Sequence, residues 1–241
     1  MTKGVIIIHG LTGTPVTMAP LTTALAVGGF TVNTPLLPGH GTSVESLSGT
    51  KWREWASCAA DAYDQLAQST DEIYSVGLSL GSLLAINLAL DKTRPLKKIA
   101  CLGTPLKLSP MLENFLLPLS HIPPVRQLIR YSKKDWAESV GDKDGLELYK
   151  QGSYHKIPVS SVWQLQGLQR ALLPRLKEIN LPMLIIHSRR DTVAPPINVK
   201  ILTNAAKEGL TKVVWLLHSR HVITLDSERD IVSQQVVQFF S

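Results

Sequence analysis

Residues 73–90 read Ile-Tyr-Ser-Val-Gly-Leu-Ser-Leu-Gly-Ser-Leu-Leu-Ala-Ile-Asn-Leu-Ala-Leu and contain a G-x-S-x-G pattern centred on Ser79. The segment Ile73–Gly77 has the length and apolar content of a buried parallel strand. The segment Leu80–Leu90 has only two polar residues and predicts a helix that is buried nearly all round. Ser79 then lies on a strand-to-helix turn between two glycines, which is typical of a nucleophile elbow. An ordinary glycine-rich turn is the alternative interpretation.

The chain outside this segment continues to alternate short apolar runs with helical patterns. Apolar residues from Trp52 to Leu66 recur at spacings of three and four, which predicts an amphipathic helix. The last helix is expected to begin near Asp226, where Ser227-x-x-Asp230 fits a capping box. This alternation predicts an α/β fold, with a mostly parallel sheet of six or more strands flanked by helices. The further predicted strands are Val5–Ile8, Thr31–Leu36, Lys98–Leu102, Met183–His187 and Lys212–Leu217.

The alternation is interrupted between Pro105 and Pro182, a stretch that is too long for a simple connection. This stretch carries its own apolar residues, which are dense from Met111 to Ile129. We therefore predict one domain over residues 1–241, with a small helical cap insertion at about residues 106–180. The cap is expected to pack over one end of the sheet.

The charge balance is basic, because 25 Lys and Arg residues outnumber 19 Asp and Glu residues and give a net charge of +6. The basic residues are scattered, whereas nucleic-acid binding proteins gather them on one face beside a recognition motif. No nucleic-acid partner is therefore expected. The densest stretch, Arg126–Lys134, is interpreted as a solvated helix face. Attraction of this stretch to anionic lipid or to acidic ligands is the alternative.

The sequence also bears on compartment and cofactors. No apolar run approaches the roughly 18 residues that span a bilayer, and the first residues resemble a strand rather than a signal peptide. Cys58 and Cys101 fit no metal, redox or disulfide spacing. A cytoplasmic protein without a transmembrane segment is expected, and neither a metal nor a cofactor is predicted.

A serine hydroxyl becomes a good nucleophile only when a base accepts its proton and an acid orients that base. After a nucleophile elbow, the acid and then the histidine follow along the chain. Asp191 and His221 each follow a predicted strand by a short loop, so both are expected beside Ser79 at the carboxyl end of the sheet. His218 is the rival base, although it falls at the strand end, where a histidine often caps the strand or faces water.

The other histidines and acids are assigned different roles. The histidines outside the expected position are His9, His40, His121, His155 and His187, the last of which is expected to be packed. Asp226 and Asp230 are interpreted as charges at a helix start. The acids of the insertion, which are expected to be solvated, are Asp135, Asp142 and Asp144.

The negative charge that develops on a substrate oxygen needs preorganised donors. Leu80 follows the proposed nucleophile at a helix N-terminus, so its backbone N–H is one expected donor. The second is expected in the loop His9–Gly13 after the first strand, where Leu11 occupies the appropriate position. A tight turn at His9-Gly10 is the alternative and is compatible with this role.

Four motifs occur together in this chain: His9-Gly10-Leu11-Thr12-Gly13, Leu37-Pro38-Gly39-His40-Gly41, Gly77-Leu78-Ser79-Leu80-Gly81 and Ser219-Arg220-His221-Val222-Ile223-Thr224-Leu225-Asp226. With them the chain resembles the α/β-hydrolases, and more narrowly the bacterial carboxylesterases and monoacylglycerol lipases. Trp52-x-x-Trp55 lies where that group tends to carry tryptophan. The resemblance covers the chain from its first strand to its last helix, except for the insertion. It implies an α/β-hydrolase fold and a triad of Ser79, Asp191 and His221.

Two positions depart from that group. Arg220 stands where glycine usually precedes the catalytic histidine, and a bulky cation there is expected to disfavour protonated His221 or to close part of the pocket. Ser82 stands where a further glycine is common after the elbow, which is a minor change on the first helical turn.

The leading hypothesis for function is a serine carboxylester hydrolase that cleaves small or monoacyl esters, with a small-molecule ester as its partner. The apolar insertion suggests medium or long acyl chains. A thioesterase, acyltransferase or peptidase could use the same triad, since the fold does not determine the substrate. From other classes, the alternatives are a ligand sensor with negligible turnover and a protein that contacts lipid surfaces through Arg126–Lys134 in the cap.

Overall fold

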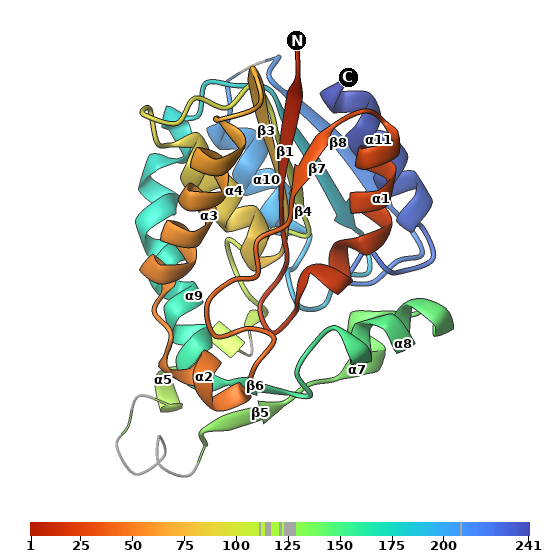
Figure 1. Cartoon of the computed structure of the whole chain (residues 1–241). Helices are drawn as coiled ribbons and strands as arrows, with labels where there is room; N and C mark the ends of the chain where they lie inside the picture. The colour runs from red at the N-terminus through yellow and green to blue at the C-terminus, as the bar shows by residue number, and fades with distance from the viewer. Residues whose placement is uncertain (111, 114–116, 121, 123–128, 208) are drawn as a thin grey trace.

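The computed structural model of the chain describes residues 1–110, 112–113, 117–120, 122, 129–207 and 209–241 (Figure 1). The centre of the fold is a six-stranded sheet in the order β2-β1-β3-β4-β7-β8, in which every neighbouring pair of strands is parallel. This sheet confirms the predicted α/β-hydrolase fold class. Its strands are β1 (Lys3–Ile8), β2 (Thr31–Asn33), β3 (Glu72–Leu78), β4 (Ile99–Leu102), β7 (Met183–Ser188) and β8 (Thr211–Leu216).

Helices cover both faces of the sheet. Successive side chains of a strand point to opposite faces, so apolar residues at successive positions need a cover on each face. In β1, Ile6 and Ile8 belong to one core, whereas Val5 and Ile7 belong to the other. The first core lies under α3 (Trp52–Leu66), α4 (Leu80–Ala89), α9 (Val159–Leu172) and α10 (Ile197–Ala205). The second lies under α1 (Ala19–Val27) and α11 (Arg229–Phe240). Within the described ranges, none of the helices has the length and apolar character to cross a membrane.

The predicted strand and helix on either side of Ser79 are confirmed as β3 and α4. Most of α4 is buried, which agrees with its nearly continuous apolar sequence. The stripe from Trp52 to Leu66 is also confirmed, since α3 buries Trp55, Ala59, Ala62, Tyr63 and Leu66. The loops between these elements contain η1 (Pro15–Met18) and α2 (Val44–Gly49).

The insertion, residues 106–180, contains strands as well as helices. Its described elements are α5 (Leu117–Ser120), β5 (Tyr131–Lys133), α7 (Trp136–Ser139), α8 (Lys143–Gln151), β6 (Lys156–Pro158), α9 and η3 (Leu173–Glu178). Strands β5 and β6 pair antiparallel, with Tyr131 opposite Pro158. The predicted small helical insertion therefore contains a strand pair besides its helices, which the sequence did not indicate because strands this short and far apart in the chain leave no local periodicity. Figure 1 shows α5, β5, β6, α7 and α8 gathered at the end toward which the sheet strands run.

Two predicted boundaries also differ from the structure. Strand β2 ends at Asn33 rather than Leu36, and α11 begins at Arg229 rather than near Asp226. The prediction of a capping box at Ser227-x-x-Asp230 is wrong, since the N-cap of α11 is Glu228 and its side chain makes no capping hydrogen bond. The reason is that the carboxylate of Asp226 is fully buried and accepts backbone N–H groups of Gly141, Asp142, Arg220 and Ser227.

The described part of the basic stretch that was predicted as a solvated helix face contains a strand followed by a buried lysine. Residues 126–128 lie outside the described residues, Tyr131–Lys133 forms β5, and the side chain of Lys134 is buried. Nζ of Lys134 donates to Oγ of Ser153 at 3.0 Å and lies 4.9 Å from the ring of Trp136 and 4.3 Å from that of Tyr149. Burial lowers the pKa of Lys134 to about 7.

Candidate active site

The turn that carries Ser79 has an unusual backbone. Ser79 has φ 54° and ψ −117°, a conformation that residues with a side chain rarely adopt. A Cβ on Gly77 would stand 2.0 Å from the carbonyl oxygen of Gly81, and a Cβ on Gly81 would stand 2.0 Å from that of Ile8. Only glycine fits at these two positions, so the G-x-S-x-G spacing is what allows α4 to pack against the sheet behind Ser79.

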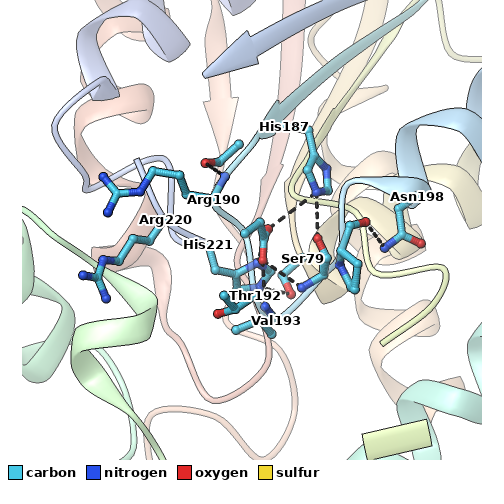
Figure 2. Close-up of polar contacts among 12 residues, drawn as sticks. Ser79, His187, Arg190, Thr192, Val193, Asn198, Arg220 and His221 are labelled. Carbon is cyan, nitrogen blue, oxygen red and sulfur yellow. Dashed lines mark hydrogen bonds and ion pairs between the residues drawn. The ribbon is translucent and has the colours of Figure 1, made fainter. Parts of the chain in front are cut away.

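The side chains of Ser79, His221 and Asp191 form a hydrogen-bonded series (Figure 2). Nε2 of His221 lies 2.9 Å from Oγ of Ser79, and Nδ1 of His221 lies 2.8 Å from Oδ2 of Asp191. The three residues come from the loops that follow β3, β8 and β7, at the carboxyl edge of the sheet. An imidazole whose Nδ1–H donates to a carboxylate leaves Nε2 free to accept a hydroxyl proton. The structure thus brings together the three residues predicted as a triad.

The environment of Asp191 keeps its carboxyl group ionised. Oδ1 accepts the backbone N–H groups of Val193 and Ala194 at 2.9 and 2.8 Å, while Oδ2 faces His221. Burial by itself would raise the pKa of Asp191, but the charge and hydrogen bond of His221 and the backbone hydrogen bond hold that pKa below its ordinary value. A buried carboxylate with all these partners can hold His221 in one orientation.

His187 is packed behind the loop that carries Asp191. Its side chain is buried, and Nε2 lies 2.8 Å from the carbonyl oxygen of Ala194 and 3.7 Å from Oδ2 of Asp191. Burial lowers the pKa of His187 and outweighs the opposing effect of Asp191. The imidazole is therefore neutral and donates from Nε2 to the carbonyl oxygen of Ala194.

Sequence reasoning missed two residues that surround this series. Gly103, directly after β4, has φ 53°, and a Cβ there would stand 3.6 Å from Oδ2 of Asp191 and from Cε1 of His221. The buried Asn198 joins the Asp191 loop to the start of the insertion. Its Oδ1 accepts the N–H of Lys107, and its Nδ2 donates to the carbonyl groups of Lys107 and Pro195. The position of Gly103 at the end of a predicted strand could have indicated its role, whereas nothing in the sequence singles out Asn198.

The loop after β1 lies against the Ser79 turn. A Cβ on Gly10 would stand 3.3 Å from Cβ of Ser79. The carbonyl oxygen of Gly10 accepts hydrogen bonds from the backbone N–H of Gly13 and from Nδ1 of His9, both at 3.0 Å. Because the Gly10–Leu11 peptide is planar and trans, anchoring its carbonyl on one side fixes the N–H of Leu11 on the other. Leu80, the other predicted donor, is the first residue of α4.

His9 is held in one tautomer by its surroundings. Its Nε2 accepts the backbone N–H of Leu37 at 3.2 Å, so the proton is on Nδ1, which faces Gly10. Burial lowers the pKa of His9 to about 3. The ring of His40 packs edge-on against His9 with centroids 4.9 Å apart, and burial lowers the pKa of His40 to about 4. Both histidines of these motifs are therefore neutral and structural, a role that the sequence did not distinguish.

The rival residues do not join the series. His218 is exposed, and its backbone N–H donates to Glu228. His155 is also exposed, while His121 lies outside the described residues. Among the acids of the insertion, Asp135 and Asp144 are exposed, whereas Asp142 caps α8 and forms an ion pair with Arg229 at 2.8 Å.

The two departures from the expected motifs have local explanations. Figure 2 shows the guanidinium group of Arg220 extending away from Ser79. This group contacts the carbonyl oxygen of Ala137 and the carboxylate of Glu138. This placement lends no support to the expectation that Arg220 closes part of the pocket. Ser82 lies on the first turn of α4, where its Oγ donates to the carbonyl oxygen of Ser79 at 2.6 Å.

The described residues contain no candidate metal site. Among them, no three His, Cys, Asp or Glu side chains are grouped so that they could hold a metal ion. The chemistry available at Ser79 is that of a hydroxyl beside an imidazole and a carboxylate, which suits nucleophilic attack on a carbonyl carbon.

Comparisons with known proteins agree with this geometry. The family model described as serine aminopeptidase, S33 matches residues 1–228. The chain is 32% identical over 241 residues to a thermostable monoacylglycerol lipase of Bacillus sp. (strain H-257), covering 99% of this chain and 90% of that protein. It is 26% identical to a carboxylesterase of Bacillus subtilis (strain 168), over 98% of this chain and 92% of the relative.

Solved structures give the same picture. A structure reported for the metagenome-derived lipolytic enzymes LipS and LipT superposes with a TM-score of 0.85 at 27% identity. The match covers 99% of this chain and 93% of that one. The matches to these relatives and to this solved structure cover nearly the whole chain, so they include the residues of the insertion.

Proposed function

Since this chain belongs to the serine aminopeptidase S33 family of α/β-hydrolases, we propose that it hydrolyses carboxylic esters through an acyl-enzyme intermediate on Ser79. The observation that carries this proposal is the hydrogen-bonded series of Ser79, His221 and Asp191 at the carboxyl edge of the sheet. The carboxylesterase and monoacylglycerol lipase relatives, which match nearly the whole chain, support ester hydrolysis as the reaction.

In the proposed reaction, Oγ of Ser79 attacks the ester carbonyl carbon while Nε2 of His221 accepts the hydroxyl proton. His221 then gives this proton to the alcohol oxygen, and the carbon–oxygen bond to the alcohol breaks. Water attacks the resulting acyl-serine with His221 again as the base, and the acid is released with Ser79 restored. Asp191 holds Nδ1 of His221 and stabilises the imidazolium that forms in each half of the reaction.

Two backbone N–H groups are proposed to bind the oxyanion, those of Leu11 and Leu80. The position of Leu80 at the first turn of α4 supports its role, because the helix dipole favours negative charge there. The anchored carbonyl of Gly10 supports the role of Leu11, since it keeps the Leu11 N–H in one orientation before substrate arrives. Donors that are already oriented stabilise the transition state without reorganisation.

We propose that residues 106–180 act as a cap within a single domain and bind the acyl group of small or monoacyl esters, with medium or long chains included. Apolar residues of this segment join the core beside α3 and α4, which supports a cap that is packed onto the same domain: Leu106, Leu108, Leu117, Leu165, Leu168 and Leu172. The relative named monoacylglycerol lipase supports the same substrate class.

Weak contact between the cap and a lipid surface is a further part of this proposal. Leu119, Ile122 and Ile129 are each nearly half exposed, and the cations of Arg130 and Lys133 follow them in the chain. Exposed apolar side chains with basic residues close to them in the chain suit the surface of a lipid aggregate that holds the substrate. A cytoplasmic location is proposed from the free thiols of Cys58 and Cys101, which fit a reducing compartment.

The proposal is tested by hydrolysis of p-nitrophenyl esters from acetate to palmitate, with wild type compared with Ser79→Ala. We expect wild type to be active and the alanine variant to lose activity, with the chain-length optimum reporting the size of the acyl site. Equal activity of both proteins would refute Ser79 as nucleophile. Saturable ester binding without turnover in wild type would favour a ligand sensor, and activity confined to thioesters would favour a thioesterase.

A further inference from the structure

The insertion contacts both loops of the proposed triad through α7 and the residues that follow it. Glu138, on α7, places Oε2 2.8 Å from Oγ1 of Thr192 and Oε1 3.5 Å from Nη1 of Arg220. Thr192 directly follows Asp191, and Arg220 directly precedes His221. One carboxylate on the insertion therefore bridges the residue next to the proposed acid and the residue next to the proposed base.

The contacts on the His221 side are redundant. The carbonyl oxygen of Ser139 accepts the backbone N–H of Val222 at 2.9 Å. The buried carboxylate of Asp226 accepts the N–H groups of Gly141 and Asp142 at 3.0 and 2.9 Å. Because these three hydrogen bonds hold the His221 loop to the insertion, loss of the Arg220 contact alone leaves that loop attached.

The contact on the Asp191 side is not redundant in this way. Among the hydrogen bonds of described residues 135–142, the bond from Thr192 to Glu138 is the one that reaches the Asp191 loop. Asn198 holds the far end of that loop, through Pro195, to the start of the insertion. The near end, beside the carboxylate that contacts His221, reaches the insertion through Glu138. It is also joined to the His221 loop itself, because Oγ of Ser188 donates to the carbonyl oxygen of Ser219 and Nη1 of Arg190 donates to that of His218.

We propose that Glu138 is a positioning residue that sets the Asp191 loop relative to the His221 loop, so that the insertion helps to align the triad as well as covering it. This inference rests on the proposed function. Glu138 touches neither substrate nor the reacting atoms, and its effect passes through Thr192 and Arg220. Catalytic groups need a supporting shell that holds them to about 0.5 Å, and looser support lowers the rate without preventing substrate binding.

The geometry ranks the variants. Glu138→Ala and Thr192→Val both break the bond to the Asp191 loop, so each is expected to lower kcat by about five- to tenfold with KM within about twofold of wild type. Glu138→Gln keeps an acceptor for Thr192 and should retain nearly the wild-type kcat. Arg220→Gln should have a smaller effect than Glu138→Ala, because the hydrogen bonds accepted by the carbonyl oxygen of Ser139 and the carboxylate of Asp226 remain.

The experiment measures kcat and KM for p-nitrophenyl butyrate in these variants, together with the rate and final extent of labelling of Ser79 by diethyl p-nitrophenyl phosphate. A positioning role predicts slower labelling by Glu138→Ala that still reaches the wild-type extent, whereas partial unfolding would lower the extent. Glu147→Ala is the matched control, since Glu147 is an exposed acid on α8 that pairs with Lys150. It should behave as wild type.

The outcomes are distinct. If Glu138→Ala matches Glu147→Ala in kcat and labelling rate, the positioning role is overturned. If Glu138→Gln is as impaired as Glu138→Ala, the bridge to Thr192 is overturned in favour of charge alone. Loss of activity in Ser79→Ala with no effect in Glu138→Ala refutes this inference while the proposed function stands, and retained activity in Ser79→Ala refutes the proposed function itself.

Discussion

Nε2 of His9 accepts the backbone N–H of Leu37 at 3.2 Å, which joins the loop after β1 to the loop after β2. This bond leaves the proton of His9 on Nδ1, where it donates to the carbonyl oxygen of Gly10 at 3.0 Å. The orientation of the Leu11 N–H, a proposed oxyanion donor, is thereby linked to a loop more than twenty residues away in the chain.

Substitution of His9 by phenylalanine keeps a ring in the core but removes both hydrogen bonds. We expect kcat to fall by about tenfold or more, short of the 10²–10³ that loss of an oxyanion donor costs, because Gly13 still anchors Gly10. KM should change little. Ester kinetics on the folded variant measure this, with the exposed His155→Gln as control. An unchanged kcat would show that His9 does not orient the loop.

Substitution Asp191→Asn tests the proposed acid. An amide at this position can donate to Nδ1 of His221 and favour the tautomer that cannot accept the proton of Ser79. We expect kcat to fall by about 10³–10⁴, with the fold intact. Asp135→Asn, an exposed acid that caps α7, is the control and should keep full activity. A loss of less than tenfold in Asp191→Asn would remove this residue from the triad.

Lys134 is expected to make stability depend on pH above neutrality. Its pKa is lowered from 10.5 to about 7 by burial, so between these values the unfolded chain binds more protons than the folded chain. Stability should therefore rise with pH in this window, by about 1.4 kcal/mol per unit from this group. Urea unfolding of wild type and Lys134→Met at pH 7, 8 and 9 measures the slope.

The methionine variant should show a flatter profile and be more stable than wild type at pH 7, because no charge is desolvated. Lys133→Met, at the exposed neighbouring position, should keep the wild-type slope. Equal slopes in wild type and Lys134→Met would mean that Lys134 stays charged in the folded protein.

The buried His40 is expected to make the stability of the fold depend on pH below about 6.5. Burial lowers its pKa from 6.5 to about 4, so the unfolded chain gains a proton first as the pH falls. Its contribution to stability is present above pH 6.5 and is lost as the pH falls toward 4, by about 1.4 kcal/mol per unit. His9, with its pKa lowered to about 3, adds a slope of the same sign.

Unfolding of His40→Gln between pH 7 and 5 should show a shallower loss of stability than wild type. The exposed His218→Gln is the matched control and should follow wild type. If His40→Gln loses stability as steeply as wild type between pH 7 and 5, a group other than His40 causes the loss of stability at acidic pH.

The proposed lipid contact is tested by flotation with anionic vesicles at low and high salt. We expect weak binding of wild type that decreases with salt and is reduced further in Leu119→Ser/Ile129→Ser, because both apolar side chains lie on the cap surface. Val27→Ser is the control, since Val27 is 85% exposed but lies on α1, away from the cap. Identical flotation of the cap variant and wild type would contradict this surface.

Much of the fold could be predicted because its signals are local. The strand β3, the turn at Ser79 and the helix α4 each follow from composition and glycine spacing within eighteen residues. The chain order of Ser79, Asp191 and His221 could also be predicted, since each follows a recognisable strand. Parallel strands end at the same edge of a sheet, so those three loops had to meet.

Other features depended on contacts that no local pattern encodes. A lysine in a basic stretch predicts exposure, yet Lys134 is buried because Trp136, Tyr149 and Ser153 fold around it. Asp226 fits a helix cap in sequence, yet the insertion supplies the N–H groups that it accepts.

The sequence by itself determined the sheet, the elbow and the order of the proposed triad, because backbone propensity and hydrophobic periodicity act over a few neighbouring residues. Only the tertiary structure decided the tautomer of His9, the burial of Lys134 and the bridge that Glu138 makes between Thr192 and Arg220. Each of these depends on the distance between side chains from segments remote in the chain, and that distance exists only once the two cores have packed.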